Sequence, residues 1–146
     1  MSVKENKDLM LRYVKEGNAA KGDVTKLLAL VDKYFDPKFV FHLPTGDLSL
    51  KQTKQVATSI YKSFPDANFT IDDIIATGDK VIARATMRAT HKGEYLGVDP
   101  TEKKIKLVGI SIDRIARGKI VERWYVNDIF GLMIQLGAIP NPFVQK

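Results

Sequence analysis

The second half of the chain carries long segments whose apolar residues recur at every second position, the period of a half-buried β-strand. These segments cover residues 69–76, 81–91, 105–115 and 120–126. In the second segment one face carries Ala83, Ala85, Met87, Ala89 and His91, and the other carries Arg84, Thr86, Arg88 and Thr90. Tight turns at residues 77–79 and 117–118 join neighbouring segments, so the pattern predicts an antiparallel meander.

The first half of the chain shows the spacing of amphipathic helices instead. An apolar stripe predicts a helix over about residues 7–15, and Asp23 is placed to cap a second helix that continues to residue 35. A short strand is predicted at residues 39–43. Ser49 and Gln52 form a capping box for a third helix. Helices followed by strands predict an α+β fold, in which a curved antiparallel sheet wraps around the helices and leaves a pocket.

Length and composition narrow the class of protein. A chain of 146 residues suits one domain, so residues 1–146 are predicted to form a single domain. The absence of cysteine excludes disulfides and thiolate chemistry. The polar N-terminus lacks a signal core and no run reaches membrane-spanning length, so we expect a cytoplasmic protein without a membrane partner. The net charge of +6 is dispersed, and no nucleic-acid partner is expected.

The last predicted strand runs directly into a helix, and this junction holds the candidate catalytic residue. Trp124, Val126 and Asp128 lie two positions apart and share a face, which places a carboxylate at the end of an apolar row. A carboxyl group in an apolar cleft can hold or release a proton at useful pH. Aspartate is also a favoured helix N-cap, and in that role Asp128 is structural. Asn127 can cap equally well, so both alternatives stay open.

Several segments together resemble a known family. Residues 118–124, Asp128, residues 131–137 and Pro140 resemble the SnoaL-like polyketide cyclases, also called ester cyclases. Residues 91–97 followed by Pro100 and Thr101 resemble their middle loop, and residues 39–42 resemble their first-strand histidine motif. The chain departs from the family pattern at Glu102, where many members have glycine, and at Arg123, where many have histidine. The resemblance implies the nuclear-transport-factor-2-like (NTF2-like) fold, a cone of curved sheet and helices around a cavity.

The resemblance also implies chemistry without a cofactor. The two histidines and the scattered acids show no metal-ligand spacing, so no metal is expected. Characterised cyclases close a ring in an aromatic polyketide ester by aldol condensation, and an aspartate matching Asp128 acts as general acid/base. We therefore predict Asp128 and His42 as catalytic residues, and a substrate pocket formed by Trp124, His91, Val126, Phe41 and Tyr61. A purely structural role for either histidine stays open. The expected ligand is an apolar or aromatic small molecule.

Two other functions remain open. The cavity can serve a non-catalytic protein that binds an apolar small molecule, and the direction of the Asp128 carboxylate distinguishes this function from catalysis. An epoxide-hydrolase-like enzyme needs an Asp-Arg-Asp arrangement, but the neighbours Asp113 and Arg114 face opposite ways on one strand. Arg114 and Glu122 flank a turn and can pair across the hairpin. A homodimer through the outer face of the sheet is expected, because dimers are common in the resembled family.

Overall fold

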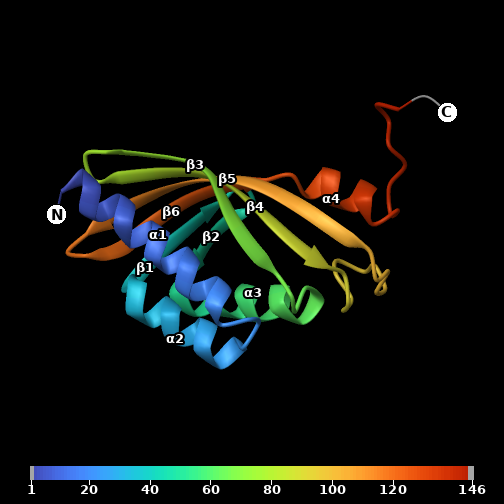
Figure 1. Cartoon of the computed structure of the whole chain (residues 1–146), viewed down its shortest axis with the longest axis horizontal. Coiled ribbons are helices and arrows are strands. Elements are labelled where there is room, and N and C mark those ends of the chain that lie inside the picture. Colours follow the sequence, from blue (N-terminus) through green and yellow to red (C-terminus); the bar gives the residue numbers. More distant parts are fainter. Residues whose placement is uncertain (1, 145–146) are drawn as a thin grey trace.

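The computed structural model describes residues 2–144, which form four helices and one six-stranded sheet (Figure 1). The helices are α1 (Val3–Ala19), α2 (Val24–Tyr34), α3 (Leu50–Ser63) and α4 (Ile129–Gln135). The strands are β1 (Phe35–Leu43), β2 (Gly46–Ser49), β3 (Asn68–Thr77), β4 (Lys80–Thr90), β5 (Lys104–Ala116) and β6 (Lys119–Asn127). They are arranged in the order β2-β1-β6-β5-β4-β3. The predicted α+β class and the meander from β3 to β6 are confirmed.

The sheet is mixed, whereas the sequence predicted an antiparallel one. β1 pairs in parallel with β6, and the other neighbouring strands pair antiparallel. β1 begins at Phe35, directly after α2, and its register shifts between Phe35 and Val40. Pro37 lies in this irregular stretch, where a residue without a backbone N–H is tolerated. The strand therefore begins four residues before the start at residue 39 that the sequence predicted.

Helix starts follow the capping chemistry of the sequence. The Asp23 side chain accepts a hydrogen bond from the Lys26 N–H at the start of α2. Ser49 and Gln52 exchange both bonds of the capping box at the start of α3. α1 begins at Val3, four residues before the predicted start, with Ser2 as its cap. Its first turn carries Lys4, Glu5 and the buried but polar Asn6, so no apolar stripe marked it.

The three N-terminal helices gather on one side of the sheet, and α4 lies towards its other end (Figure 1). Two clusters of buried side chains hold these layers together. The first joins α1 and α2 to the sheet and contains Leu9, Met10, Val31, Tyr34, Phe35, Phe39, Val81, Ile115 and Ile120. The second joins α4 to the sheet and contains Phe64, Ala67, Met87, Ala89, Ile105, Leu107, Leu132, Met133 and Leu136. Each large side chain buried in this way stabilises the fold by about 1.5–3 kcal/mol.

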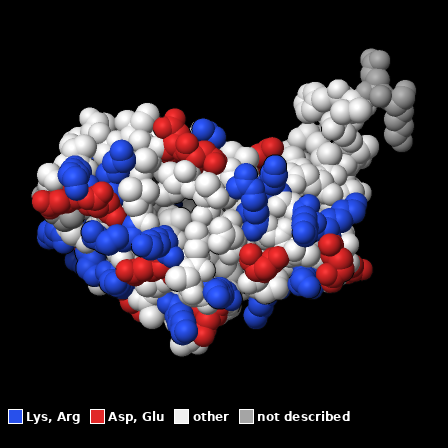
Figure 2. All heavy atoms as spheres, viewed as in Figure 1, with Lys and Arg blue, Asp and Glu red and all other residues white. Residues whose placement is uncertain are grey.

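Acidic and basic side chains are interspersed over the face drawn in Figure 2, with no broad area of one sign. This distribution agrees with the dispersed lysines of the sequence and is typical of a solvated surface. Among the described residues, no helix combines the length and the apolar character needed to cross a membrane.

Candidate functional site

A cavity of about 280 Å³ lies between helices α1–α3 and the covered face of the sheet. Its walls are mostly apolar and include residues packed against both core clusters, such as Tyr13 and Phe41 from the first and Ile60 and Phe69 from the second. Ligand pockets generally start at about 300 Å³. A cavity of about 150 Å³ already accepts benzene. The space is therefore large enough for a small aromatic molecule.

Small residues of the sheet create this space. On the side opposite the helices, the cavity is lined by Ala83 and Ala85 of β4 and by Gly109 and Ser111 of β5. A Cβ atom on Gly109 would lie 2.3 Å from the Tyr125 hydroxyl oxygen, so the missing side chain makes room for the Tyr125 ring. Tyr125 is paired with Ser111 on the neighbouring strand. Strand β6 thus contributes an aromatic wall where β5 has no bulk.

One end of the cavity holds a buried ion pair. Asp113 of β5 and Arg123 of β6 face each other in the strand register, and Asp113 is 0% exposed. Arg123 Nε donates to Asp113 Oδ1 at 2.6 Å, and Arg123 Nη2 donates to Asp113 Oδ2 at 2.8 Å. Burial acts to lower the pKa of Arg123, but the Asp113 charge outweighs it and the pKa is raised. The guanidinium therefore stays charged, with its charge balanced by Asp113.

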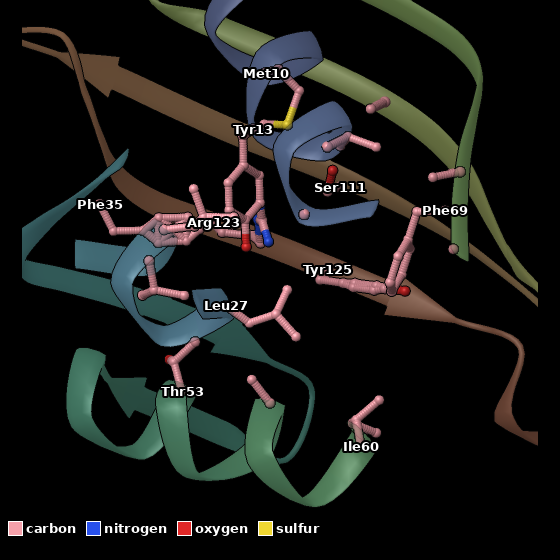
Figure 3. Close-up of a pocket in the computed structure, with 18 of the residues that line it drawn as sticks. Met10, Tyr13, Leu27, Phe35, Thr53, Ile60, Phe69, Ser111, Arg123 and Tyr125 are labelled. Carbon is pink, nitrogen blue, oxygen red and sulfur yellow. The ribbon is translucent and has the colours of Figure 1, made fainter. Parts of the chain in front are cut away.

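Aromatic residues surround this guanidinium (Figure 3). The Arg123 Cζ atom lies 5.3 Å from the Phe35 ring centre and 6.0 Å from the Phe41 ring centre, within cation–π range. Tyr13 points from α1 towards Arg123, and Tyr125 lies farther along β6. Burial raises the pKa of Tyr13 and of Tyr125, so both hydroxyls keep their protons and remain hydrogen-bond donors at neutral pH.

Of the predicted pocket residues, Phe41 and Tyr61 line the cavity. Burial raises the pKa of Tyr61 to about 12. Trp124 and Val126 lie on the opposite face of β6, where they are 37% and 58% exposed. Side chains alternate along a strand, so the residues of β6 that reach the cavity are Arg123 and Tyr125.

His42 lies on the outer face of the sheet, stacked on Trp124 with ring centres 4.9 Å apart. Its Nδ1 is 2.8 Å from Asp47 Oδ1 and its Nε2 is 2.9 Å from Glu122 Oε2. Glu122 also accepts a hydrogen bond from Arg114 Nε at 2.7 Å, the pairing across the hairpin that the sequence suggested. Glu122, and then Asp47, raise the pKa of His42. The structure shows a charged surface network at His42, and its catalytic role stays a prediction.

His91 is fully buried at the end of β4 and does not line the cavity. Its Nδ1 accepts a hydrogen bond from the Thr101 N–H at 3.2 Å, and its ring lies 5.6 Å from that of Phe64. Its backbone N–H donates to Lys103 O, and its carbonyl accepts from the Glu102 N–H. These contacts hold the two ends of the loop at residues 92–103 together.

Asp128 occupies the N-cap position of α4. Its Oδ1 accepts a hydrogen bond from the Gly131 N–H at 2.9 Å, and the residue is exposed outside the cavity lining. A Cβ atom on Gly131 would lie 2.2 Å from Asp128 Oδ2, so glycine permits this close approach. The structure thus shows the capping alternative, and catalysis by Asp128 stays a prediction.

The sequence did not single out Tyr13, Tyr125 or Ser111 as site residues. It considered Asp113 only for an Asp-Arg-Asp arrangement, and it marked Arg123 only as a departure from the family pattern. A usable signal lies in the alternation of β5, where small or polar residues (Gly109, Ser111, Asp113) interrupt an apolar row from Ile105 to Ile115. Within residues 2–144 no group of three or more histidine, aspartate or glutamate side chains is placed to hold a metal ion.

A curved, open sheet with helices packed into its hollow around an apolar cavity defines the NTF2-like class of fold. A model of the SnoaL-like polyketide cyclase family matches residues 19–136. The chain therefore belongs to the SnoaL-like polyketide cyclase family, as the sequence resemblance indicated.

Solved structures agree with this assignment. AclR from Streptomyces galilaeus, provisionally assigned as a hydroxylase, is 30% identical, with a TM-score of 0.82 over 99% of this chain and 87% of AclR. IdmH from Streptomyces antibioticus, provisionally assigned as a polyketide cyclase, is 27% identical, with a TM-score of 0.74 over 86% of this chain and 96% of IdmH. A Jannaschia sp. CCS1 protein, provisionally assigned as a SnoaL-like polyketide cyclase, is 20% identical with a TM-score of 0.82 over 94% of each chain, which supports the fold alone. Among curated protein sequences, none matches the chain significantly.

Proposed function

We propose that the protein is an enzyme of the polyketide cyclase type, which takes an apolar small molecule into the cavity and closes a ring or isomerises a carbonyl compound. One observation supports this function most directly: the cavity is apolar on most sides and has the Arg123 guanidinium at one end, with Tyr13 pointing towards it (Figure 3). The provisional assignment of IdmH as a polyketide cyclase points to the same chemistry.

The chemistry needs little beyond positioning and one proton transfer. Hydrogens between two carbonyl groups are acidic, so a carboxylate base can remove one of them. A proton transfer by a positioned side chain contributes about 10²–10⁴-fold to the rate. A mostly apolar cavity can hold the substrate near its reactive pose and reduces its contact with water. Hydrogen-bond donors near the new enolate oxygen stabilise its charge.

Asp128 is the acid/base that the family resemblance implies for this chain. Its Oδ1 is engaged by the helix, while Oδ2 has no hydrogen bond within the described residues. The exposed position of Asp128 favours the second candidate function, in which the cavity binds an apolar small molecule without converting it. The two functions differ in what they require of the Asp128 carboxylate, which makes this residue the point to test.

The test compares Asp128→Asn with the matched variant Asp23→Asn. Both aspartates are helix N-caps, and asparagine caps about as well as aspartate, so the stability of either variant changes little. An aromatic β-keto ester serves as substrate, and ring closure is followed by mass spectrometry. If Asp128 is the base, Asp128→Asn loses at least about 10²-fold in rate and Asp23→Asn does not. Equal turnover in both variants would remove Asp128 from the mechanism, and binding without turnover by the wild type would favour the non-catalytic function.

An epoxide-hydrolase-like mechanism has less support. It needs two acidic side chains and an arginine in the cavity. The lining, within the described part of the chain, includes Arg123 but no aspartate or glutamate, and Asp113 is fully buried behind Arg123.

We also propose a homodimer formed through the outer face of the sheet. Four apolar side chains lie exposed there on the paired strands β5 and β6: Val108, Ile110, Trp124 and Val126. Charged residues, such as Arg84 on β4 and the Arg114–Glu122 pair, surround this apolar strip. An apolar centre with a polar rim is typical of protein interfaces. A second copy of the chain would cover the strip on both protomers at once.

A further inference from the structure

The guanidinium of Arg123 has N–H groups that its partner Asp113 does not use. An arginine presents five N–H groups, and Asp113 takes one from Nε and one from Nη2. Arg123 Nη1 makes no hydrogen bond to any atom within residues 2–144. Arg123 lines the cavity, so these remaining N–H groups are available to whatever fills it. The Arg123 side chain is 17% exposed, and a ligand with an acceptor atom in the cavity would form a charge-assisted hydrogen bond with these N–H groups.

The charge of this end of the cavity limits the kind of acceptor. Asp113 balances Arg123, and no aspartate, glutamate, histidine, lysine or further arginine lines the cavity within the described residues. A carboxylate entering such a neutral, poorly solvated space would bring an uncompensated charge, which is unfavourable. A neutral carbonyl oxygen brings a strong acceptor without that cost. The same donors would also stabilise partial negative charge if it develops on that oxygen.

Two further donors lie beside Arg123 on the same wall. Ser111 and Tyr125 face each other across β5 and β6, two register positions from Asp113 and Arg123 and on the same face of the sheet. Both line the cavity (Figure 3). Two residues along a strand correspond to roughly 6.6 Å. The wall formed by β5 and β6 thus places three polar side chains along one side of a mostly apolar space.

We propose that Arg123 binds a carbonyl oxygen of a neutral, largely apolar ligand, and that Asp113 is the positioning residue that fixes the guanidinium. This assignment rests on the proposed function, because it takes the cavity as the ligand site, and it adds the chemical class of the ligand's polar group. It gives a role to the arginine at which this chain departs from the histidine of many family members.

Three probes of matched size test the assignment with the full chain: 2-acetylnaphthalene, 2-ethylnaphthalene and 2-naphthoate. Affinities are measured by NMR titration, with the Ala85 methyl as cavity reporter and the exposed Ala19 methyl as reference. We expect the ketone to bind about tenfold more tightly than the ethyl compound, since a hydrogen bond to a charged donor is available only to the ketone. The carboxylate should bind no more tightly than the ethyl compound.

Variants then locate the preference. Arg123→Met alone would leave Asp113 unpaired, so the test variant is Asp113→Leu with Arg123→Met, which replaces the whole pair by apolar side chains. The matched control is Glu122→Leu with Arg114→Met, which removes the ion pair on the outer face of the same two strands. The tenfold preference for the ketone should vanish in the first double variant and persist in the second.

Each alternative outcome has a distinct meaning. Equal affinity of the wild type for all three probes would overturn the Arg123 assignment and leave the cavity as a ligand site. A preference that survives in Asp113→Leu/Arg123→Met would do the same. Failure of all three probes to shift the Ala85 methyl would overturn the proposed function together with the assignment.

Discussion

At the scale of single residues, the hairpin of β5 and β6 carries two ion pairs in very different surroundings. Asp113–Arg123 is buried on the cavity side, whereas Arg114–Glu122 lies partly exposed on the outer face. A buried charge that loses its partner stays desolvated, while an exposed charge is solvated by water. The same chemical change should therefore have different effects on stability at the two sites.

We predict that Arg123→Met lowers the free energy of unfolding by about 3–5 kcal/mol because it leaves Asp113 buried and unpaired. Arg114→Met should lower it by about 1 kcal/mol or less. Adding Asp113→Leu to Arg123→Met should restore much of the loss. Urea unfolding followed by circular dichroism measures all three. Similar losses for the two single variants would show that burial does not set the strength of these pairs.

His42 makes stability depend on pH. Its pKa is raised above 6.5, first by Glu122 and then by Asp47, so its contribution is complete below 6.5 and is lost as pH rises through the folded-state pKa. The pKa of Glu122 is lowered from 4.5, first by Arg114 and then by His42. Its contribution is therefore complete above 4.5 and is lost as pH falls through the lowered folded-state pKa. The network should therefore stabilise the fold most between these two limits.

We predict that the free energy of unfolding decreases as pH rises above 6.5, and that His42→Gln removes this part of the pH dependence. Trp124 is the only tryptophan and stacks on His42, so its fluorescence reports the same proton. Protonated imidazole quenches indole, and the emission should therefore rise with a midpoint above 6.5. A midpoint at or below 6.5 would contradict the geometry of the network.

Residue identity could be read from the sequence, but the direction of each side chain could not. The alternation of β6 was recognised, yet the row Trp124–Val126–Asp128 was expected on the cavity side, where the structure has Arg123 and Tyr125. A displacement of one residue moves every side chain of a strand to the opposite face. Both rows of β6 contain aromatic and polar residues, so hydropathy alone does not distinguish them.

At the scale of elements, the short helix α4 depends on its cap. Asp128 Oδ1 accepts the Gly131 N–H, one of the amides that a helix start leaves without an internal partner. Local capping chemistry of this kind is visible in sequence, as the confirmed caps at Asp23 and Ser49 show.

We predict that Asp128→Ala lowers the free energy of unfolding by about 1 kcal/mol, and that Asp128→Asn changes it by much less. Hydrogen exchange at the Gly131 amide should accelerate in the alanine variant. Asp23→Ala provides the comparison, with the Lys26 amide as its reporter. Unchanged exchange at Gly131 would mean that the observed cap does not hold in solution.

Unlike helix caps, the pairing of strands that lie far apart in the chain could not be predicted from the sequence. The sequence predicted β1 as a short strand but did not predict its parallel partner. That partner is β6, which lies about 80 residues away in the chain and pairs in the register His42↔Trp124. Neither strand carries a local signal for the other, since such a partner is selected by packing. β2 contains only four residues, Gly46–Ser49, and the sequence did not predict it as a strand.

At the scale of the whole molecule, the cavity and the outer face lie on opposite sides of one sheet. The apolar strip of Val108, Ile110, Trp124 and Val126 is the surface for the proposed dimer. We predict that Val126→Glu converts a dimer to a monomer in sedimentation velocity experiments, because it places a charge at the centre of the strip. Leu96→Glu, at a comparably exposed residue of the loop after β4, should leave the dimer intact. A wild-type monomer would overturn the dimer proposal.

The sequence by itself determined the helix caps at Asp23 and Ser49, the period of the strands, the α+β class and the family, because each of these depends on residues close together in the chain or on a recurring motif. Only the tertiary structure decided which face of β6 borders the cavity, that Asp113 and Arg123 meet there, and that β1 joins the sheet in parallel. Those features depend on strand register and on packing between distant segments. Their free energies arise only when the segments are assembled.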